Sequence, residues 1–327
     1  MSRRALVTGA GGFIAHHMAR YLVKKGYWVR GVDVKHPEFS ATEADEFLIL
    51  DLRDLDNCMR ACGDVDEVYH LAADMGGIGY ITAIHADVAR NNVLIDAHML
   101  EAARRNEVDR FFYSSSACIY PMYRQQDPDV VPLKEGDAYP ADPEPGYGWE
   151  KLYSELLCRY YLEDFGFQTR VARFHNIYGP EGTYQGGREK APAAICRKVA
   201  VARDGDEIEV WGDGQQTRSF TYVDDCVEGI YRITQSSHAE PLNLGSDHLV
   251  SIGELVDLVC GVAGKELHKK FDRSKPQGVR GRNSDNGLAR AVLGWEPSTT
   301  LAQGLEATYS WIESELDKRR AASVTSR

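Results

Sequence analysis

The most constraining feature of this chain is a glycine-rich turn between a short strand and a helix near its beginning. A short strand is predicted at residues 4–7, and Gly9, Gly12 and Ala15 follow it at three-residue spacing. The first glycine permits a tight turn, the second lets backbone approach a pyrophosphate, and the third position needs a small residue for helix–strand packing. The start of the helix offers unpaired N–H groups to phosphate oxygens. This order of elements predicts a dinucleotide-binding α/β fold.

A carboxylate stands where such a fold recognises the adenosine ribose. A second strand, predicted at residues 28–32, leads into Asp33, which lies 21 residues beyond Gly12. A carboxylate there accepts hydrogen bonds from the ribose hydroxyls and repels a 2′-phosphate. The sequence therefore predicts NAD, rather than NADP, as the cofactor.

Composition narrows the class of protein further. The 327 residues carry a net charge of −11, which argues against a nucleic-acid partner. No apolar run approaches the roughly 18 residues of a membrane span, and the first strand begins too early for a signal peptide. The seven cysteines are scattered and the ten histidines form no ligand pattern. We therefore expect no metal, no disulfide framework, no membrane partner and a cytoplasmic location.

Strands and helices alternate as far as about residue 175. Further strands are predicted at residues 47–50, 68–71, 110–113 and 169–174, with helices starting near Asp54, spanning 88–105 and containing Tyr147. This alternation predicts a doubly wound parallel sheet, a Rossmann fold of the α/β class, with helices on both faces. Segments 219–232 and 242–244 are regular again and are candidates to rejoin the sheet, whereas the chain after Lys318 is expected to fray.

Tyr147 and Lys151 lie four residues apart, about thirty residues after a serine run at 114–116. On a helix this spacing places both side chains on one face. A free tyrosine has a pKa of about 10, and a neighbouring lysine cation or a positively charged nicotinamide would favour the phenolate, which is a base. The pair alone is equally compatible with two ordinary helix residues. The upstream nucleotide-binding turn favours a catalytic pair.

Several segments together resemble the extended short-chain dehydrogenase/reductase superfamily, which includes nucleotide-sugar epimerases, 4,6-dehydratases and decarboxylases. They are residues 9–15, 70–73, 114–116, 218–225 and 293–295, with Tyr147 and Lys151. The resemblance implies that Ser116 and Tyr147 contact the hydroxyl that is oxidised, and that Lys151 also holds the nicotinamide ribose. It also implies a homodimer formed through the helices that follow the fourth strand and that contain Tyr147.

The resemblance extends to the binding sites and the domains. It places Asp51 at the adenine and Ala72 and Ala73 along the cofactor. The expected cofactor residues are Gly9, Gly12, Phe13, Ile14, Asp33, Asp51, Leu71, Ala72, Ala73, Tyr147 and Lys151. We expect an NAD-binding domain from residues 1–175 and 219–245, a smaller C-terminal nucleotide-sugar-binding domain from 176–218 and 246–320, and a tail at 321–327.

A narrower resemblance, to the family of GDP-mannose 3,5-epimerases, lies in residues 116–121, 186–192 and 279–286. Most other relatives have Thr or Ser where this chain has Cys118. The 4,6-dehydratases have an Asp-Glu pair where Ala117 and Cys118 stand, so the acid that dehydration needs is missing. A small buried thiol is the plain alternative for Cys118.

Inverting a sugar carbon requires removal of a carbon-bound proton. Oxidation of the C4 hydroxyl, with Tyr147 as base, would make the C3 and C5 hydrogens acidic, so that a base on one face and an acid on the other can invert each centre. We assign Cys118 as the base and Lys190 as the acid, with pKa values lowered from about 8.5 and 10.4 by burial or neighbours. A solvated surface lysine is the plain alternative for Lys190.

An anionic nucleotide sugar needs cations in so acidic a chain, and Lys198, Arg280 and Arg282 supply them. The resemblance places Lys198 and Arg282 at the diphosphate, and Asn176, Glu189 and Gln216 at the nucleotide sugar. The glycine-rich loop at residues 75–79 is expected to let backbone lie close to the hexose, and a flexible linker is the plain alternative. The expected substrate residues are Gly76, Ser116, Asn176, Glu189, Lys190, Lys198, Gln216 and Arg282. His175 is expected to be structural.

The leading hypothesis is epimerisation of a GDP-sugar, GDP-mannose, at C3 and C5 to GDP-L-galactose, with NAD recycled inside the enzyme. A C4-epimerase of a UDP-sugar shares the redox step but needs neither Cys118 nor Lys190. A non-catalytic NAD-binding module is a third hypothesis, which the intact Ser116, Tyr147 and Lys151 disfavour.

Overall fold

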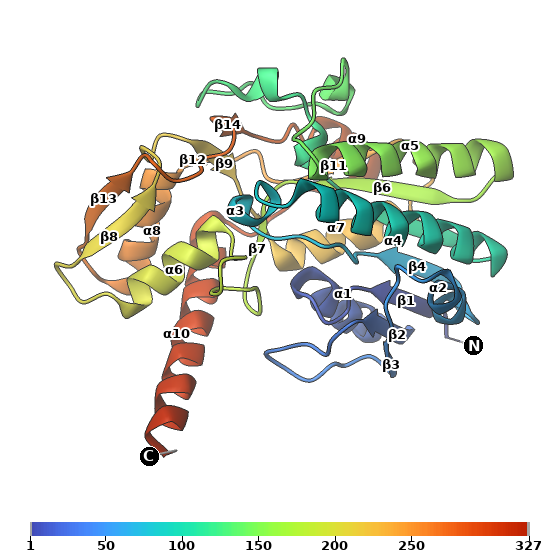
Figure 1. The fold of residues 1–327 in the computed structure, drawn as a ribbon, viewed down its shortest axis with the longest axis horizontal. Helices are drawn as coiled ribbons and strands as arrows, with labels where there is room; N and C mark the ends of the chain where they lie inside the picture. The colour runs from blue at the N-terminus through green and yellow to red at the C-terminus, as the bar shows by residue number, and fades with distance from the viewer. Residues whose placement is uncertain (1, 326–327) are drawn as a thin grey trace.

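The computed structural model describes residues 2–325 and is built on a seven-stranded parallel sheet (Figure 1). The spatial order of the strands is β11-β6-β5-β4-β1-β2-β3. Their bounds are β1 (Arg4–Thr8), β2 (Trp28–Asp33), β3 (Glu46–Ile49), β4 (Glu67–His70), β5 (Arg110–Ser116), β6 (Thr169–Phe174) and β11 (Leu242–Leu244). This confirms the predicted α/β class and the doubly wound parallel sheet.

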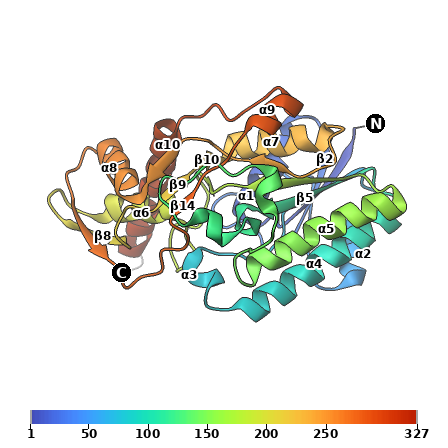
Figure 2. The ribbon, with the colours of Figure 1, turned by 90° about the horizontal axis from the view of Figure 1, so that it is seen from above.

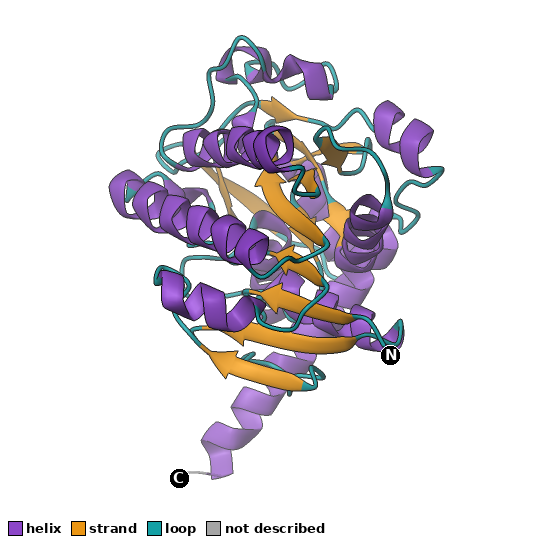
Figure 3. Ribbon diagram, turned by 90° about the vertical axis from the view of Figure 1, so that its right-hand side faces the viewer, coloured by secondary structure: helices purple, strands orange, loops and turns teal. Residues whose placement is uncertain are grey.

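Helices cover both faces of the sheet because its interior strands carry apolar side chains on both sides. In β1, Ala5 and Val7 face one core, and Leu6 faces the other. The first core is closed by α1 (Phe13–Lys24) and α7 (Val223–Gln235), and the second by α2 (Leu55–Cys62), α4 (His85–Arg105) and α5 (Tyr147–Phe165). Figure 3 shows the strands between these two helical layers.

A smaller lobe lies beside the carboxyl ends of the strands (Figure 2). This lobe contains the third hydrophobic core of the protein, which joins α6, α8 and α10 to β8, and β8 pairs in parallel with β13. The bounds of these and the remaining elements are α3 (Ile78–Ile81), α6 (Ala191–Val201), α8 (Ile252–Ala263), α9 (Gly287–Leu293), α10 (Leu301–Thr325), β7 (Ile177–Tyr178), β8 (Glu207–Trp211), β9 (Thr217–Ser219), β10 (Thr221–Tyr222), β12 (Leu249–Ser251), β13 (His268–Asp272), β14 (Gly281–Arg282) and the 3₁₀ turns η1 (Ala117–Ile119), η2 (Met122–Gln125) and η3 (Glu135–Ala138).

Three details differ from the sequence-based expectations. The strand β5 continues through Ser116, so the serine run ends a strand rather than following one. Within the segment 219–232, residues 223–232 belong to α7, and only 242–244 add a strand to the main sheet. The chain after Lys318 does not fray, because α10 continues to Thr325 and Arg319 lies 3.6 Å from Glu38. Of the predicted tail, residues 326–327 lie outside the described part.

The strand order fixes where a ligand can bind. After β1 the chain builds β2 and β3 on one side and β4, β5 and β6 on the other. A crevice opens at such a reversal, outside the carboxyl ends of the strands. Thr8, Asp33, His70 and Ser116 end four of these strands and stand at this edge. Within residues 2–325, no helix has the length and apolar character that crossing a bilayer requires.

The long helix α10 is held to the smaller lobe by its apolar face, where Leu305 is fully buried. Replacing a buried leucine by alanine costs about 2–5 kcal/mol. We predict that Leu305→Ala lowers the free energy of unfolding by that amount, as measured by urea denaturation. Glu306→Ala, at the exposed neighbouring position, is the control; equal effects of the two changes would contradict this account of α10.

Candidate active site

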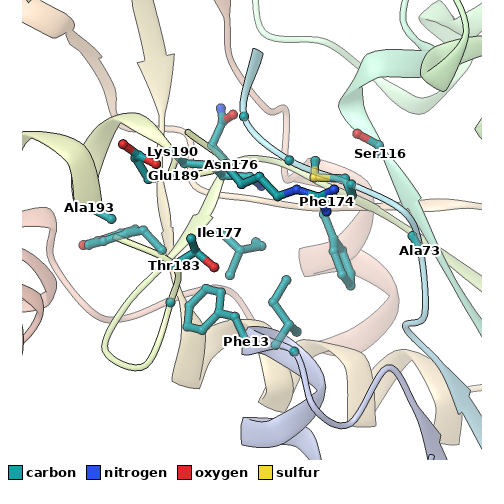
Figure 4. A pocket seen from close by; sticks show the side chains of 18 of the residues that line it. Phe13, Ala73, Ser116, Phe174, Asn176, Ile177, Thr183, Glu189, Lys190 and Ala193 are labelled. Carbon is teal, nitrogen blue, oxygen red and sulfur yellow. The ribbon is translucent and has the colours of Figure 1, made fainter. Parts of the chain in front are cut away.

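One cavity of about 960 Å³ runs from the sheet edge into the smaller lobe. All the cofactor and substrate residues predicted from the sequence line it, from Gly9 at one end to Lys198 at the other. In Figure 4, Glu189 and Lys190 lie on one side of this cavity and Ser116 on the other, with Asn176 between them. Arg280 is an exception among the cations considered: it lies outside the lining and bonds Asp213 at 2.9 Å.

The glycine-rich turn leaves space that side chains would fill. Gly9 has φ +72°, and a Cβ on Gly11 would lie 2.2 Å from the carbonyl oxygen of Lys35. Gly12 precedes α1 in an extended conformation with no side chain capping the helix, so backbone N–H groups face the cavity. Asp33 accepts a hydrogen bond from the N–H of Gly11 at 3.0 Å. The turn and its carboxylate therefore fit a dinucleotide such as NAD.

Tyr147, Ser116 and Lys151 meet at the centre of the cavity. Tyr147 is the first residue of α5, and the Lys151 Nζ lies 5.8 Å from the centroid of its ring. Burial raises the pKa of Tyr147 well above its usual value, with Cys118 and Glu150 adding to the effect and a hydrogen bond with Ser116 opposing it. The predicted lowering of this pKa is therefore wrong for the protein's own groups, because burial outweighs them.

A buried carboxylate lies next to α5, the helix that carries Tyr147 and Lys151. Asp96 of α4 accepts hydrogen bonds from His70 (3.0 Å), Tyr113 (2.9 Å) and Ser154 (2.8 Å), and lies 3.9 Å from the Lys151 Nζ. Burial alone would raise the pKa of Asp96, but Lys151 and His70 hold it below its usual value. Asp96 thus provides a countercharge for Lys151, which is almost completely buried.

A pair of polar residues on the buried face of α4 is the sequence signal for this carboxylate. Asn92 and Asp96 are four residues apart on the buried face of α4, where apolar residues are expected. Asn92 donates to Glu150 at 2.7 Å and accepts from the N–H of Asp74 at 2.6 Å. Burial raises the pKa of Glu150 to about 8. The polar stripe therefore connects α5 with the loop that follows β4.

Cys118 is buried between two oppositely charged groups. The Arg282 Nη1 lies 3.4 Å from the Cys118 Sγ, while the same guanidinium bonds Glu144 at 2.6 Å and Gln125 at 2.6 Å. Burial raises the pKa of Cys118, Glu144 raises it further, and Arg282 opposes both. The expected lowering of the Cys118 pKa is therefore wrong in its net direction: Arg282 lowers the pKa, but burial and Glu144 outweigh it. Neither Glu144 nor its pairing with Arg282 was predicted.

Lys190 lines the same cavity from the smaller lobe, immediately before α6. The residue is half-buried. Burial lowers the pKa of its amine, and Cys118 opposes that effect because the two groups are close enough to interact. The predicted base and acid are thus brought to one cavity from two separate lobes.

The remaining predicted residues are mostly engaged with the protein itself. The Lys198 ammonium group donates to the backbone carbonyl of Glu209 at 2.8 Å and to the Glu209 carboxylate at 3.1 Å. Asn176 donates to Ser219 at 3.0 Å, and Gln216 donates to Trp211 at 2.8 Å. Arg282 lies against Cys118 rather than at the far end of the cavity, where Lys198 lies.

Two further residues clarify the roles. His175 is fully buried and outside the cavity lining; it bonds Asn243 at 3.1 Å, and burial lowers its pKa to about 3, as expected of a structural histidine. Arg218, which the sequence did not single out as a ligand, lines the cavity, and its bonds within the described residues 2–325 all go to backbone carbonyls, including that of Val279 at 2.7 Å. Burial lowers its pKa to about 9.

Comparison with known proteins identifies the family. A model of the NAD dependent epimerase/dehydratase family matches residues 5–245. The chain belongs to this family. Membership in the NAD dependent epimerase/dehydratase family confirms the broader resemblance seen in the sequence and the NAD dependence predicted from Asp33.

Individual known proteins are similar to this chain over nearly its whole length. GDP-mannose 3,5-epimerase from Arabidopsis thaliana is 50% identical over 317 residues, which cover 96% of this chain and 83% of that protein. UDP-glucose 4-epimerase from Thermotoga maritima, solved with UDP-glucose, has a TM-score of 0.87 at 25% identity and coverage of 96% and 99%. UDP-glucuronic acid 4-epimerase from Bacillus cereus, in complex with UDP-glucuronic acid and NAD, has a TM-score of 0.81 at 27% identity and coverage of 95% and 99%.

The buried Asp96 makes a stability prediction. Asp96→Asn would leave the Lys151 ammonium buried without its close countercharge, and breaking a buried ion pair costs about 3–5 kcal/mol. We predict a loss of about 3 kcal/mol in the free energy of unfolding. Asp87→Asn, in an exposed pair with Arg90 on the same helix, should cost less than about 1 kcal/mol. Similar losses in the two variants would show that Asp96 does not compensate Lys151.

Proposed function

We propose that this chain epimerises GDP-mannose at C3 and C5 to GDP-L-galactose through a transient 4-keto sugar. The observation that carries the proposal is that Cys118 and Lys190 line the same cavity as Ser116, Tyr147 and Lys151. The 50% identity to a GDP-mannose 3,5-epimerase over nearly the whole chain supports the same substrate. A redox triad explains oxidation at one carbon, and the thiol and the amine explain inversion at its neighbours.

In the first step Tyr147 removes the proton of the C4 hydroxyl while Ser116 holds that hydroxyl in place. Gly9, Gly12 and Asp33 would hold NAD⁺, which when bound would supply the hydride acceptor for C4 and a positively charged ring that opposes the effect of burial on the pKa of Tyr147. Lys151, compensated by Asp96, adds a fixed positive charge below the phenol. Tyr147 returns the proton when C4 is reduced at the end of the cycle.

In the second step the C4 ketone makes the hydrogens on C3 and C5 acidic. Cys118 as thiolate removes a proton from one face of the ring, and the Lys190 ammonium delivers one from the other. The raised pKa of Cys118 makes its thiolate a stronger base, and the lowered pKa of Lys190 makes its ammonium a stronger acid. Each group is therefore more reactive in its active form, the thiolate of Cys118 or the ammonium of Lys190. At a given pH, however, a smaller fraction of each group is in that form.

We propose that the substrate spans the cavity from Gly76 and Asn176 at the hexose to Lys198 and Gln216 at the nucleotide. Arg218 is the best additional cation for the diphosphate, because within residues 2–325 no carboxylate lies within ion-pair distance of it. Arg282 is better placed to orient Cys118 and the hexose than to hold the diphosphate. NAD then lies against residues 1–175 and 219–245, and the sugar nucleotide against 176–218 and 246–320.

A homodimer and a cytoplasmic location complete the proposal. Trp149, Tyr153 and Tyr160 are about half exposed on α5, and Leu94 is partly exposed on α4. Such apolar surface on two adjacent helices, aromatic on α5 and aliphatic on α4, supports pairing with a second copy. A monomeric mass in solution would exclude the dimer.

All seven cysteines are free thiols, which supports a reducing compartment.

The activity is tested by incubating the enzyme with GDP-mannose in deuterated water and following C3 and C5 by NMR. We expect deuterium at both positions and a GDP-L-galactose product. Cys118→Ala should slow label incorporation about 10²–10⁴-fold, the usual contribution of a general base. Tyr147→Phe should abolish it, since no ketone forms.

The same experiment separates the alternatives. A UDP-sugar C4-epimerase would leave C3 and C5 unlabelled and would tolerate Cys118→Ala. If the cellular function persisted unchanged in Tyr147→Phe, the chain would be a non-catalytic NAD-binding module.

The pH dependence follows from the two shifted groups. A thiol with a raised pKa ionises only at higher pH, so activity rises into the alkaline range. An amine with a lowered pKa loses its proton sooner, so activity then falls, and the profile of kcat/KM is a narrow bell. Because Glu144 raises the pKa of Cys118, Glu144→Gln should move the acidic limb to lower pH. The control Glu306→Gln should leave it in place, and an unmoved limb in Glu144→Gln would refute the role of Cys118 as the base.

A further inference from the structure

Two loops meet over the cavity at Arg188. Its guanidinium lies 3.8 Å from the centroid of the Tyr80 ring and 3.6 Å from the carboxylate of Asp74. Its carbonyl oxygen accepts a hydrogen bond from the N–H of Gly77 at 3.1 Å. One loop follows β4 of the sheet, and the other leads into α6 of the smaller lobe. Arg188 therefore joins the two lobes across the cavity.

The loop that carries Arg188 is loosely packed on its other side. Gly186 and Gly187 have φ +95° and +88°, and a Cβ built on either would meet nothing within 4 Å. By contrast, a Cβ on Gly77 would lie 2.6 Å from the carbonyl oxygen of Glu189, so the two backbones approach closely where the loops meet. The two glycines provide a pivot with little packing, and the interactions of Arg188 fix the far end of the loop.

The surface that receives Arg188 is held firmly. Asp74 accepts hydrogen bonds from the hydroxyl of Tyr80 (2.8 Å) and the side chain of Asn91 (3.2 Å), and its N–H donates to Asn92 (2.6 Å). Both asparagines belong to α4, which packs on the sheet. Arg188, half of whose side chain is exposed, thus pairs a loosely packed segment with a firmly held one.

We propose that Arg188 is a positioning residue that latches the loop over the bound sugar, so that Lys190 faces Cys118 and the 4-keto sugar stays enclosed. The inference rests on the proposed function, because only a reaction with a keto intermediate needs such retention. Lys190 follows Arg188 by two residues, so the position of the latch sets the position of the amine. Partly exposed ion pairs and cation–π contacts are individually weak, and the latch can therefore open for substrate entry and product release.

The test is to measure escaped intermediate against finished product. Enzyme and GDP-mannose are incubated in deuterated water, and any 4-keto sugar released is trapped with borodeuteride, which places deuterium at C4. Each keto sugar that is released has lost its C4 hydrogen together with an electron pair. One equivalent of reduced cofactor therefore remains on the enzyme, and its absorbance is measured. In Arg188→Ala we expect the ratio of C4-labelled sugar to epimerised product to rise about tenfold, because the substitution removes one weak ion pair and one weak cation–π interaction.

Three variants complete the design. Arg188→Lys keeps the charge and should restore part of the retention, while Tyr80→Leu should reproduce the leak and add little to Arg188→Ala. Arg203→Ala, at an exposed position beyond α6, is the matched control. If Arg188→Ala lowers turnover but keeps the wild-type ratio of escaped to finished sugar, the latch is refuted. If the wild-type enzyme itself labels neither C3 nor C5, the proposed function fails instead, and the two failures are distinguishable.

Discussion

The buried pairing of Asp96 with Lys151 is the interaction on which the active site depends. One carboxylate binds side chains from β4, β5 and α5 while itself standing on α4, and His70 passes the connection to Thr8 of β1 at 2.8 Å. A buried ammonium ion without a nearby countercharge is strongly destabilising, and Asp96 supplies that countercharge for Lys151. The network thereby sets the rotation of α5, and with it the position of Tyr147 at the cavity.

The fold was readable from the sequence because its signals are local. Strand periodicity, the glycine turn and Asp33 each act within a few residues, and the sheet followed from their order. Interactions between distant segments were not readable. Glu144 and Arg282 are 138 residues apart and pair because η1, α5 and β14 converge. The pKa of Cys118 was predicted with the wrong sign for the same reason, since the depth of burial comes from the assembled lobes.

The two candidate inversion groups illustrate a general compromise. The site is dry enough to disfavour both a thiolate and an ammonium ion, yet it places a cation, Arg282, beside the sulfur. A solvent-exposed pair would be more fully ionised but would transfer protons to water as readily as to the sugar. Enclosure between two lobes favours transfer to the ring, and the interactions of Arg188 across the two loops belong to that enclosure.

The seventh strand has a consequence for biosynthesis. Because β11 pairs with β6, the sheet is completed by a segment made only after the chain has left for the smaller lobe and returned. Until residue 244 leaves the ribosome, β6 is an open edge with unpaired backbone groups, the kind of surface on which other strands assemble. A chain that ended before residue 242 would therefore keep β6 as an open edge of the sheet.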